Sequence, residues 1–189
     1  MQFNLVAHPS TPPSTALKVW ASVDHPASLG TVASTNIWFG VGGPADRFVI
    51  PEGVEPQRAD GLWQSTCFEA FLRIPGVDAY REWNFAPSGE WAAYDFQSPR
   101  EGRCDAEVAA PYIRIEDNFT WWALGATIPV DADAIWALGL SAILEEKNGT
   151  KSYWALAHPP GDKPDFHDPA CFTLELPPAG EVGQSSPRT

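Results

Sequence analysis

The stretch Leu138-Gly-Leu-Ser-Ala-Ile-Leu-Glu-Glu-Lys-Asn148-Gly149-Thr-Lys-Ser-Tyr-Trp-Ala-Leu-Ala157 decides the fold class of this chain. Two apolar runs, residues 138–147 and 150–157, flank an Asn-Gly pair. The tightest hairpin turns need a positive φ at both central positions, which Asn and Gly adopt most readily. The stretch therefore predicts two antiparallel strands joined by a tight turn.

Short apolar runs of the same kind continue on both sides of this hairpin. They cover residues 17–23, 35–39, 65–72, 79–86, 91–96, 112–116, 120–128 and 172–176. Nineteen Pro and fifteen Gly are spread through the chain, and no long stretch keeps a helical period. Short strands separated by turn residues are typical of a sandwich or barrel. We expect an all-β domain over residues 1–177, a β-sandwich of two antiparallel sheets, and a flexible tail over residues 178–189.

Two further segments are predicted to lie outside the strands. Residues 41–61 are rich in Gly, Pro and charge, which predicts a long loop, and residues 131–136 follow a proline and predict one helical turn. Alternation within residues 65–72 places Glu69 on the face opposite Phe68. Trp122 and Trp136 are predicted to be core residues.

Charge and cysteine content narrow the partners and the compartment. Twelve basic against twenty-four acidic residues leave a net charge of −12, which repels phosphate backbones, so we expect no nucleic-acid partner. The three cysteines, Cys67, Cys104 and Cys171, lie far apart and include no CxxC pair, so we expect reduced thiols. The N-terminus has no basic segment before an apolar stretch, so we expect no signal peptide, no membrane partner and a cytoplasmic location.

Polar residues inside two predicted strands form the first candidate site. No P-loop, GxGxxG, HExxH or GxSxG motif is present. Instead Glu69 lies in one apolar run, and Arg81, Glu82 and Asn84 lie in the next, with Arg81 on the opposite face from Glu82 and Asn84. Carboxyl and amide groups beside tryptophans suit sugar hydroxyls, although the same residues could simply face solvent. Glu69 and Glu82 could alternatively act as a glycosidase pair.

Aromatic and imidazole groups complete the candidates. Trp63, at a loop exit, and Trp154, late in a strand, are the candidate stacking platforms, with core packing as the alternative. His158, Asp165 and His167 share a proline-rich loop, which indicates a candidate metal site or, more simply, a surface loop held by turns. His158 is also a candidate for the edge of a ligand pocket.

A family resemblance follows from two neighbouring stretches. Leu62-Trp63-Gln-Ser-Thr-Cys-Phe-Glu69-Ala-Phe-Leu72 and Tyr80-Arg-Glu-Trp-Asn-Phe-Ala-Pro-Ser-Gly-Glu-Trp91 resemble the DOMON-like superfamily, which includes family 9 carbohydrate-binding modules. The resemblance spans roughly residues 15–177. It implies a two-sheet β-sandwich that binds a sugar or haem.

The resemblance also implies roles for single residues. Trp63, Glu69 and Asn84 match the region of the sugar-binding motif, and Trp154 is placed as the second aromatic by its position in the chain. Haem-binding members use Met and His as axial ligands, but Met1 is the only methionine here, so haem would need two histidines such as His158 and His167. We therefore predict a non-catalytic binding domain for a carbohydrate or similar polar molecule. A haem or metal domain and a protein-interaction module remain the alternatives.

Overall fold

The computed structural model describes residues 1–24, 27–29 and 32–179, and nearly all of its regular structure is antiparallel strand. The strands are β1 (Gln2–Ala7), β2 (Val19–Val23), β3 (Ala27–Leu29), β4 (Val32–Gly42), β5 (Cys67–Arg73), β6 (Tyr80–Phe85), β7 (Trp91–Phe96), β8 (Cys104–Asp105), β9 (Tyr112–Asp117), β10 (Trp121–Val130), β11 (Trp136–Glu145), β12 (Lys151–Ala155) and β13 (Leu174–Leu176). Three single-turn 3-10 helices are η1 (Ala45–Arg47), η2 (Leu62–Gln64) and η3 (Pro169–Cys171).

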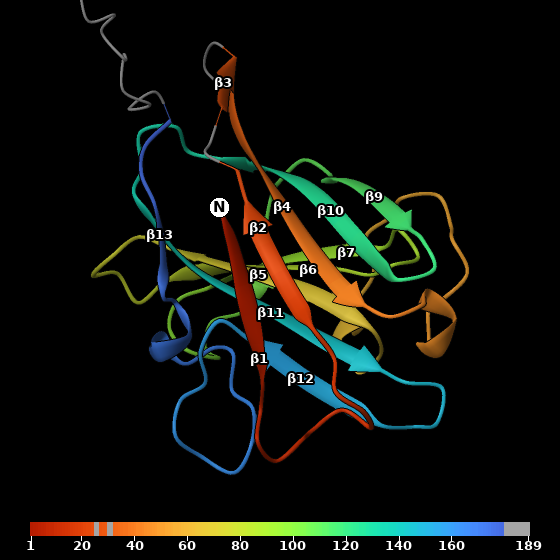
Figure 1. Cartoon of the computed structure of the whole chain (residues 1–189). Helices are drawn as coiled ribbons and strands as arrows, with labels where there is room; N and C mark the ends of the chain where they lie inside the picture. The colour runs from red at the N-terminus through yellow and green to blue at the C-terminus, as the bar shows by residue number, and fades with distance from the viewer. Residues whose placement is uncertain (25–26, 30–31, 180–189) are drawn as a thin grey trace, which may run out of the picture.

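The strands form one continuous sheet in the order β8-β7-β6-β5-β11-β12-β1-β2-β4-β10-β9. We call β5–β8 with β11 and β12 the β5 half, and β2, β4, β9 and β10 the β4 half. Figure 1 shows the β4 half in front of the β5 half, with the strands of the two halves crossing. The sheet therefore curls over on itself as a half-barrel, and the named strands pair antiparallel.

The expected separation into two sheets is not confirmed, because β1 pairs with both halves. Residues Gln2 to Leu5 pair with β2, and Val6 and Ala7 pair with β12. A strand shared in this way closes the sheet on one side and removes two of the edges that separate sheets would expose. The sequence predictions do not include β1, although Gln2-Phe3-Asn4-Leu5 alternates polar and apolar residues.

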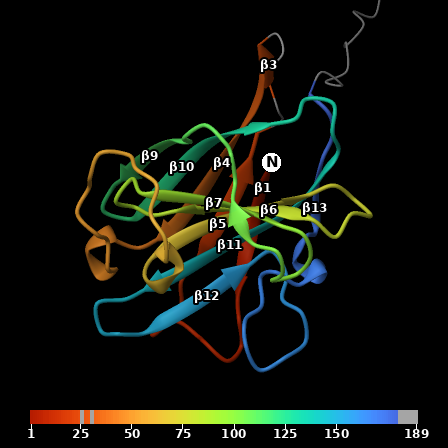
Figure 2. The ribbon, with the colours of Figure 1, turned by 180° about the vertical axis from the view of Figure 1, so that it is seen from behind.

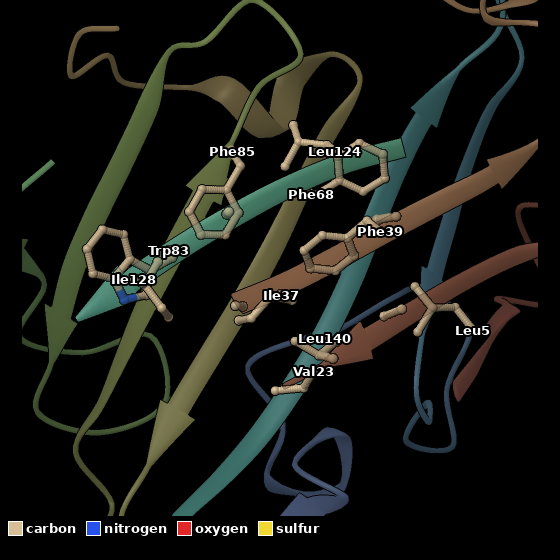
Figure 3. Packing of buried hydrophobic residues seen from close by; sticks show 14 of the residues in the cluster. Leu5, Val23, Ile37, Phe39, Phe68, Trp83, Phe85, Leu124, Ile128 and Leu140 are labelled. Carbon is tan, nitrogen blue, oxygen red and sulfur yellow. The ribbon is translucent and has the colours of Figure 1, made fainter. Parts of the chain in front are cut away.

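The core lies between the two halves of the sheet. Figure 3 shows Ile37 and Phe39 of β4 directed toward side chains of the β5 half. Phe39 stacks on Phe68 of β5 with ring centroids 5.1 Å apart, and Trp122 of β10 meets Phe68 edge-on at 5.5 Å. Fully burying each of these large apolar side chains contributes about 2–3 kcal/mol before entropy is subtracted.

The predicted hairpin at residues 138–157 is confirmed as β11 and β12, with Gly149 at a φ of 88°. The predicted core position of Trp122 is confirmed, and Trp136 is partly buried against the same core. The helical turn predicted for residues 131–136 is wrong. There the Asp131 carboxylate accepts from the Asp133 N–H in a turn, and β11 begins at Trp136.

The remaining chain-level expectations have mixed outcomes. All three cysteines are free, with Cys67 and Cys171 buried and Cys104 exposed. In the described ranges no helix is long and apolar enough to cross a membrane. Most of the predicted tail, residues 180–189, lies outside the residues that the structure describes.

Candidate functional site

The candidate site is a pocket on the outer face of the β5 half, away from the core. Figure 2 looks onto this face. Alternation sends Phe68, Ala70 and Leu72 of β5 into the core, so Glu69 between them faces outward. The cavity is about 360 Å³. Its lining residues are Trp63, Glu69, Glu82, Tyr94, Phe96, Arg100, Arg103, Ile143, Tyr153, Pro164, Phe166 and His167.

Two carboxyl groups form the floor of this pocket. Glu69 of β5 and Glu82 of β6 are only 4% and 5% exposed. Glu69 Oε2 accepts from the Ser141 hydroxyl at 2.7 Å, and Glu82 Oε1 accepts from the Asn84 amide at 2.6 Å. Asn84 lies directly opposite Glu69 in the register of β5 and β6, so Glu69, Glu82 and Asn84 share one face of the two strands.

Both floor carboxyl groups hold their protons more tightly than exposed glutamates do. Burial, reinforced by the neighbouring Glu82, raises the pKa of Glu69 to about 8, against the bond from Ser141. Burial also raises the pKa of Glu82, although the Asn84 amide and the two rim arginines oppose the shift. Two carboxyl groups that share a dry site resist ionising together, so the floor carries fewer than two negative charges near neutral pH.

The walls of the pocket are aromatic. Tyr94 and Phe96 come from β7, Tyr153 comes from β12, and Phe166 comes from the loop after β12. Trp63, in η2, stands at the mouth with 37% of its surface exposed, and its ring meets Tyr94 edge-on at 6.4 Å. Exposed aromatic faces around a polar floor can hold a ligand that is apolar on its faces and polar at its edge.

The rim carries two arginines, each of which already has a carboxylate partner. Arg100 contacts Asp165 at 2.7 Å, and Arg103 contacts Asp60 at 3.2 Å. The Arg103 guanidinium also lies 4.1 Å from the centre of the Tyr94 ring, and the Tyr94 hydroxyl donates to Asp60. The rim is therefore balanced in charge by its own side chains.

His167 closes the pocket beside Glu82. Its Nδ1 is 2.6 Å from the Tyr80 hydroxyl, and its Nε2 is 3.8 Å from Glu82 Oε2. Burial, helped by Arg100, lowers the pKa of His167 to about 4. The imidazole is thus neutral at neutral pH, and its contact with Glu82 is not an ion pair.

The predicted site residues divide into two groups. The pocket brings together Trp63, Glu69, Glu82 and His167, with Asn84 bonded to Glu82 beneath the floor. Two other candidates, Arg81 and Trp154, do not line the pocket. Arg81 lies on the opposite face of β6, where it pairs with Asp95 at 2.7 Å, and Trp154 is 5% exposed within the main core.

The predicted metal and haem donors do not converge. His158 Nε2 bonds to the Val6 carbonyl at 2.8 Å, Asp165 is engaged by Arg100, and His167 points to Tyr80 and Glu82. Throughout the described residues no three His, Cys, Asp or Glu side chains gather closely enough to hold a metal ion. The histidine pair therefore does not fit haem or a metal in this fold.

Several residues that line the pocket were not predicted from the sequence. Tyr153 directly precedes Trp154 and therefore faces the pocket when Trp154 faces the core. Strand alternation could have indicated this once the buried face was known. Arg100, Arg103 and Phe166 come from loops, and no sequence period reports on the direction of a loop side chain.

Comparison with known proteins defines the fold class. No family model and no curated protein matches the sequence. A candidate carbohydrate-binding protein from Bacteroides uniformis has a similar structure, with a TM-score of 0.64 and 17% identity over 93% of this chain and 85% of that one. A family 9 carbohydrate-binding module from Caldicellulosiruptor kristjanssonii, solved with cellotriose, has a TM-score of 0.53 and 9% identity over 98% and 87%. The chain has a fold like that of family 9 carbohydrate-binding modules, as its sequence resemblance implied.

Proposed function

We propose that this protein binds a carbohydrate or a similar polar small molecule in the pocket of the β5 half, without transforming it. The observation that carries the proposal is a floor of two buried carboxyl groups, Glu69 and Glu82, beneath aromatic walls. Carboxyl oxygens accept from sugar hydroxyls, and aromatic rings pack against the C–H faces of a sugar.

Pocket size and fold also support a small polar ligand. A volume of about 360 Å³ lies at the small end of the range for ligand pockets, which suits one or two sugar rings. The family 9 module with a similar fold was solved in complex with cellotriose. Because fold alone does not decide function, the proposal depends on the pocket and its chemistry.

Tryptophan fluorescence and calorimetry test the proposal. Among the described tryptophans only Trp63 lines the pocket, so saturation with a mono- or disaccharide should shift the emission of the native protein. The Trp63→Phe variant should lose most of that shift. Trp38→Phe is the matched control, because Trp38 lies under Arg114 on the outer face of the β4 half. No heat and no fluorescence change across a broad panel at millimolar concentrations would contradict the proposal.

The same carboxyl pair requires a test for catalysis. If Glu69 and Glu82 acted as a glycosidase pair, incubation with aryl glycosides would release the coloured phenol. Binding without chemistry predicts that the glycosides stay intact while they compete with other sugars for the pocket. Release that disappears in Glu82→Gln would replace the binding proposal with an enzymatic one.

A further inference from the structure

We propose that the pocket selects ligands that carry a primary ammonium group, so that amino sugars are its preferred carbohydrates. The sugar part of this inference rests on the proposed function. The ammonium part rests on the charges and aromatic faces of the pocket itself.

The floor is a pair of acids without a cationic partner. Within the described part of the chain, no Lys or Arg lies within 4.0 Å of either floor carboxyl group, and the partners of these groups are the neutral Ser141 and Asn84. His167, whose Nε2 lies 3.8 Å from Glu82 Oε2, is neutral at neutral pH. A buried carboxyl group without a counter-charge either keeps its proton or gains a cation.

The rim arginines do not fill this role. Arg100 and Arg103 are 58% and 43% exposed, and Asp165 and Asp60 already occupy their guanidinium groups. The Arg103 guanidinium also lies over the Tyr94 ring, 4.1 Å from its centre. The cationic position above the floor is thus left to the ligand.

The walls favour a cation as well. Phe96, Tyr153 and Phe166 line the cavity, and among the described residues no arginine lies over their rings, whereas Arg103 already lies over Tyr94 and Trp63. The faces of aromatic rings attract an ammonium group through their negative potential, most strongly where water is displaced. Carboxyl groups below and aromatic faces around are complementary to an ammonium group that donates three hydrogen bonds.

Neutral and acidic sugars complement the floor of the pocket less well than amino sugars do. A neutral sugar offers hydroxyl donors to Glu69 and Glu82 but no charge. An acidic sugar would bring a third carboxyl group into a site where two already compete for ionisation. The order of affinity expected from the pocket is therefore amino sugar, then neutral sugar, then acidic sugar.

Calorimetry at pH 7 with three sugars tests the order: D-glucosamine, D-glucose and D-glucuronate, which differ at single substituents. We expect D-glucosamine to bind at least about tenfold more tightly than D-glucose, since a charge-assisted hydrogen bond to a buried carboxylate contributes that much. The preference should shrink in Glu82→Gln, where Glu69 remains as a carboxyl partner, and fall to near parity in the Glu69→Gln/Glu82→Gln double variant. Glu175→Gln, on the exposed side of β13, is the matched control.

A second pair of ligands separates this inference from the proposed function. Cyclohexylamine and cyclohexanol have similar shapes, and only the amine is charged at pH 7. Equal binding of D-glucosamine and D-glucose overturns the ammonium preference and leaves sugar binding in place. Binding of cyclohexylamine without any sugar overturns sugar binding and keeps the ammonium preference. If none of these ligands binds, both proposals are wrong.

Discussion

Trp154 and Trp63 show how the position of a tryptophan in the chain decides whether it packs in the core or lines the pocket. Trp154 in β12 pairs with Ala142 of β11, whose side chain is in the core, so Trp154 is also directed into the core. Its indole N–H donates to the buried Ser152 hydroxyl at 2.9 Å. Trp63 precedes β5 in η2, outside any strand, and its ring is free to stand at the mouth of the pocket.

These placements predict opposite effects for the same substitution. Trp154→Ala should lower the free energy of unfolding by about 3–5 kcal/mol, because it leaves a cavity in the core and a buried hydroxyl without its donor. Trp63→Ala should change it by less than about 1 kcal/mol, since its ring is partly in water. Urea unfolding followed by far-UV circular dichroism measures both. Equal losses in the two variants would place Trp63 in the core as well.

Among the elements, β1 pairs with both halves of the sheet. Its first four residues hydrogen-bond to the β4 half and its last two to the β5 half, so it joins the two parts of the curled sheet. Its side chains alternate, with Gln2, Asn4 and Val6 exposed and Phe3, Leu5 and Ala7 partly or fully buried, but only Leu5 is fully buried. Backbone pairing, rather than a buried face, defines this strand.

Neighbouring substitutions in β1 test its attachment to the core. Leu5→Ala should cost about 2–4 kcal/mol, because Leu5 is 4% exposed and packs in the main core. Val6→Ala should cost well under about 1 kcal/mol, because Val6 is 57% exposed on the opposite face. Thermal unfolding of the two variants beside the native protein makes the comparison. A small effect of Leu5→Ala would mean that β1 contributes little to the core.

At the scale of the whole molecule, local patterns predicted more than long-range ones. The Asn148-Gly149 hairpin and the placement of Glu69 on the face opposite Phe68 follow from turn chemistry and strand alternation, and the structure confirms both. Alternation cannot tell which face of a strand the rest of the chain will cover. For that reason the sequence leaves Trp154 as either a stacking platform or a core residue, and the joining of both halves through β1 could not be predicted.

The candidate site was predictable to the same extent. Glu69, Glu82 and Asn84 could be grouped from sequence because they lie on adjacent strands at matching positions. The loop residues Arg100, Arg103 and Phe166 reach the pocket only through tertiary packing. The histidines of the loop after β12 share a short segment, yet His158 bonds to β1 while His167 turns toward β6.

The free energy of unfolding of the whole molecule should depend on pH through the buried carboxyl group of Glu69. Glu69 has a pKa of about 8 when folded and 4.5 as a free side chain, so the folded state binds more protons between these values. Stability from this group is complete below pH 4.5 and is lost as the pH rises through 8. The lowered pKa of His167 acts the other way, but only between its unfolded value of 6.5 and about 4. The raised pKa of Cys67 matters only above 9.

The interval from pH 6.5 to 8.5 therefore isolates the floor carboxyl groups. Over this interval the free energy of unfolding of the native protein should fall by about 2 kcal/mol relative to Glu69→Gln, which carries the same histidines, at roughly 1.4 kcal/mol per pH unit until Glu69 ionises. Glu69→Gln keeps an acceptor for the Ser141 hydroxyl but cannot ionise, so its stability should change far less and exceed that of the native protein at pH 8.5. Urea titrations at closely spaced pH values measure the slope, with Glu175→Gln as the control that retains it. A Glu69→Gln variant with the native slope would show that another group holds the proton, and would remove the buried acid from the floor of the pocket.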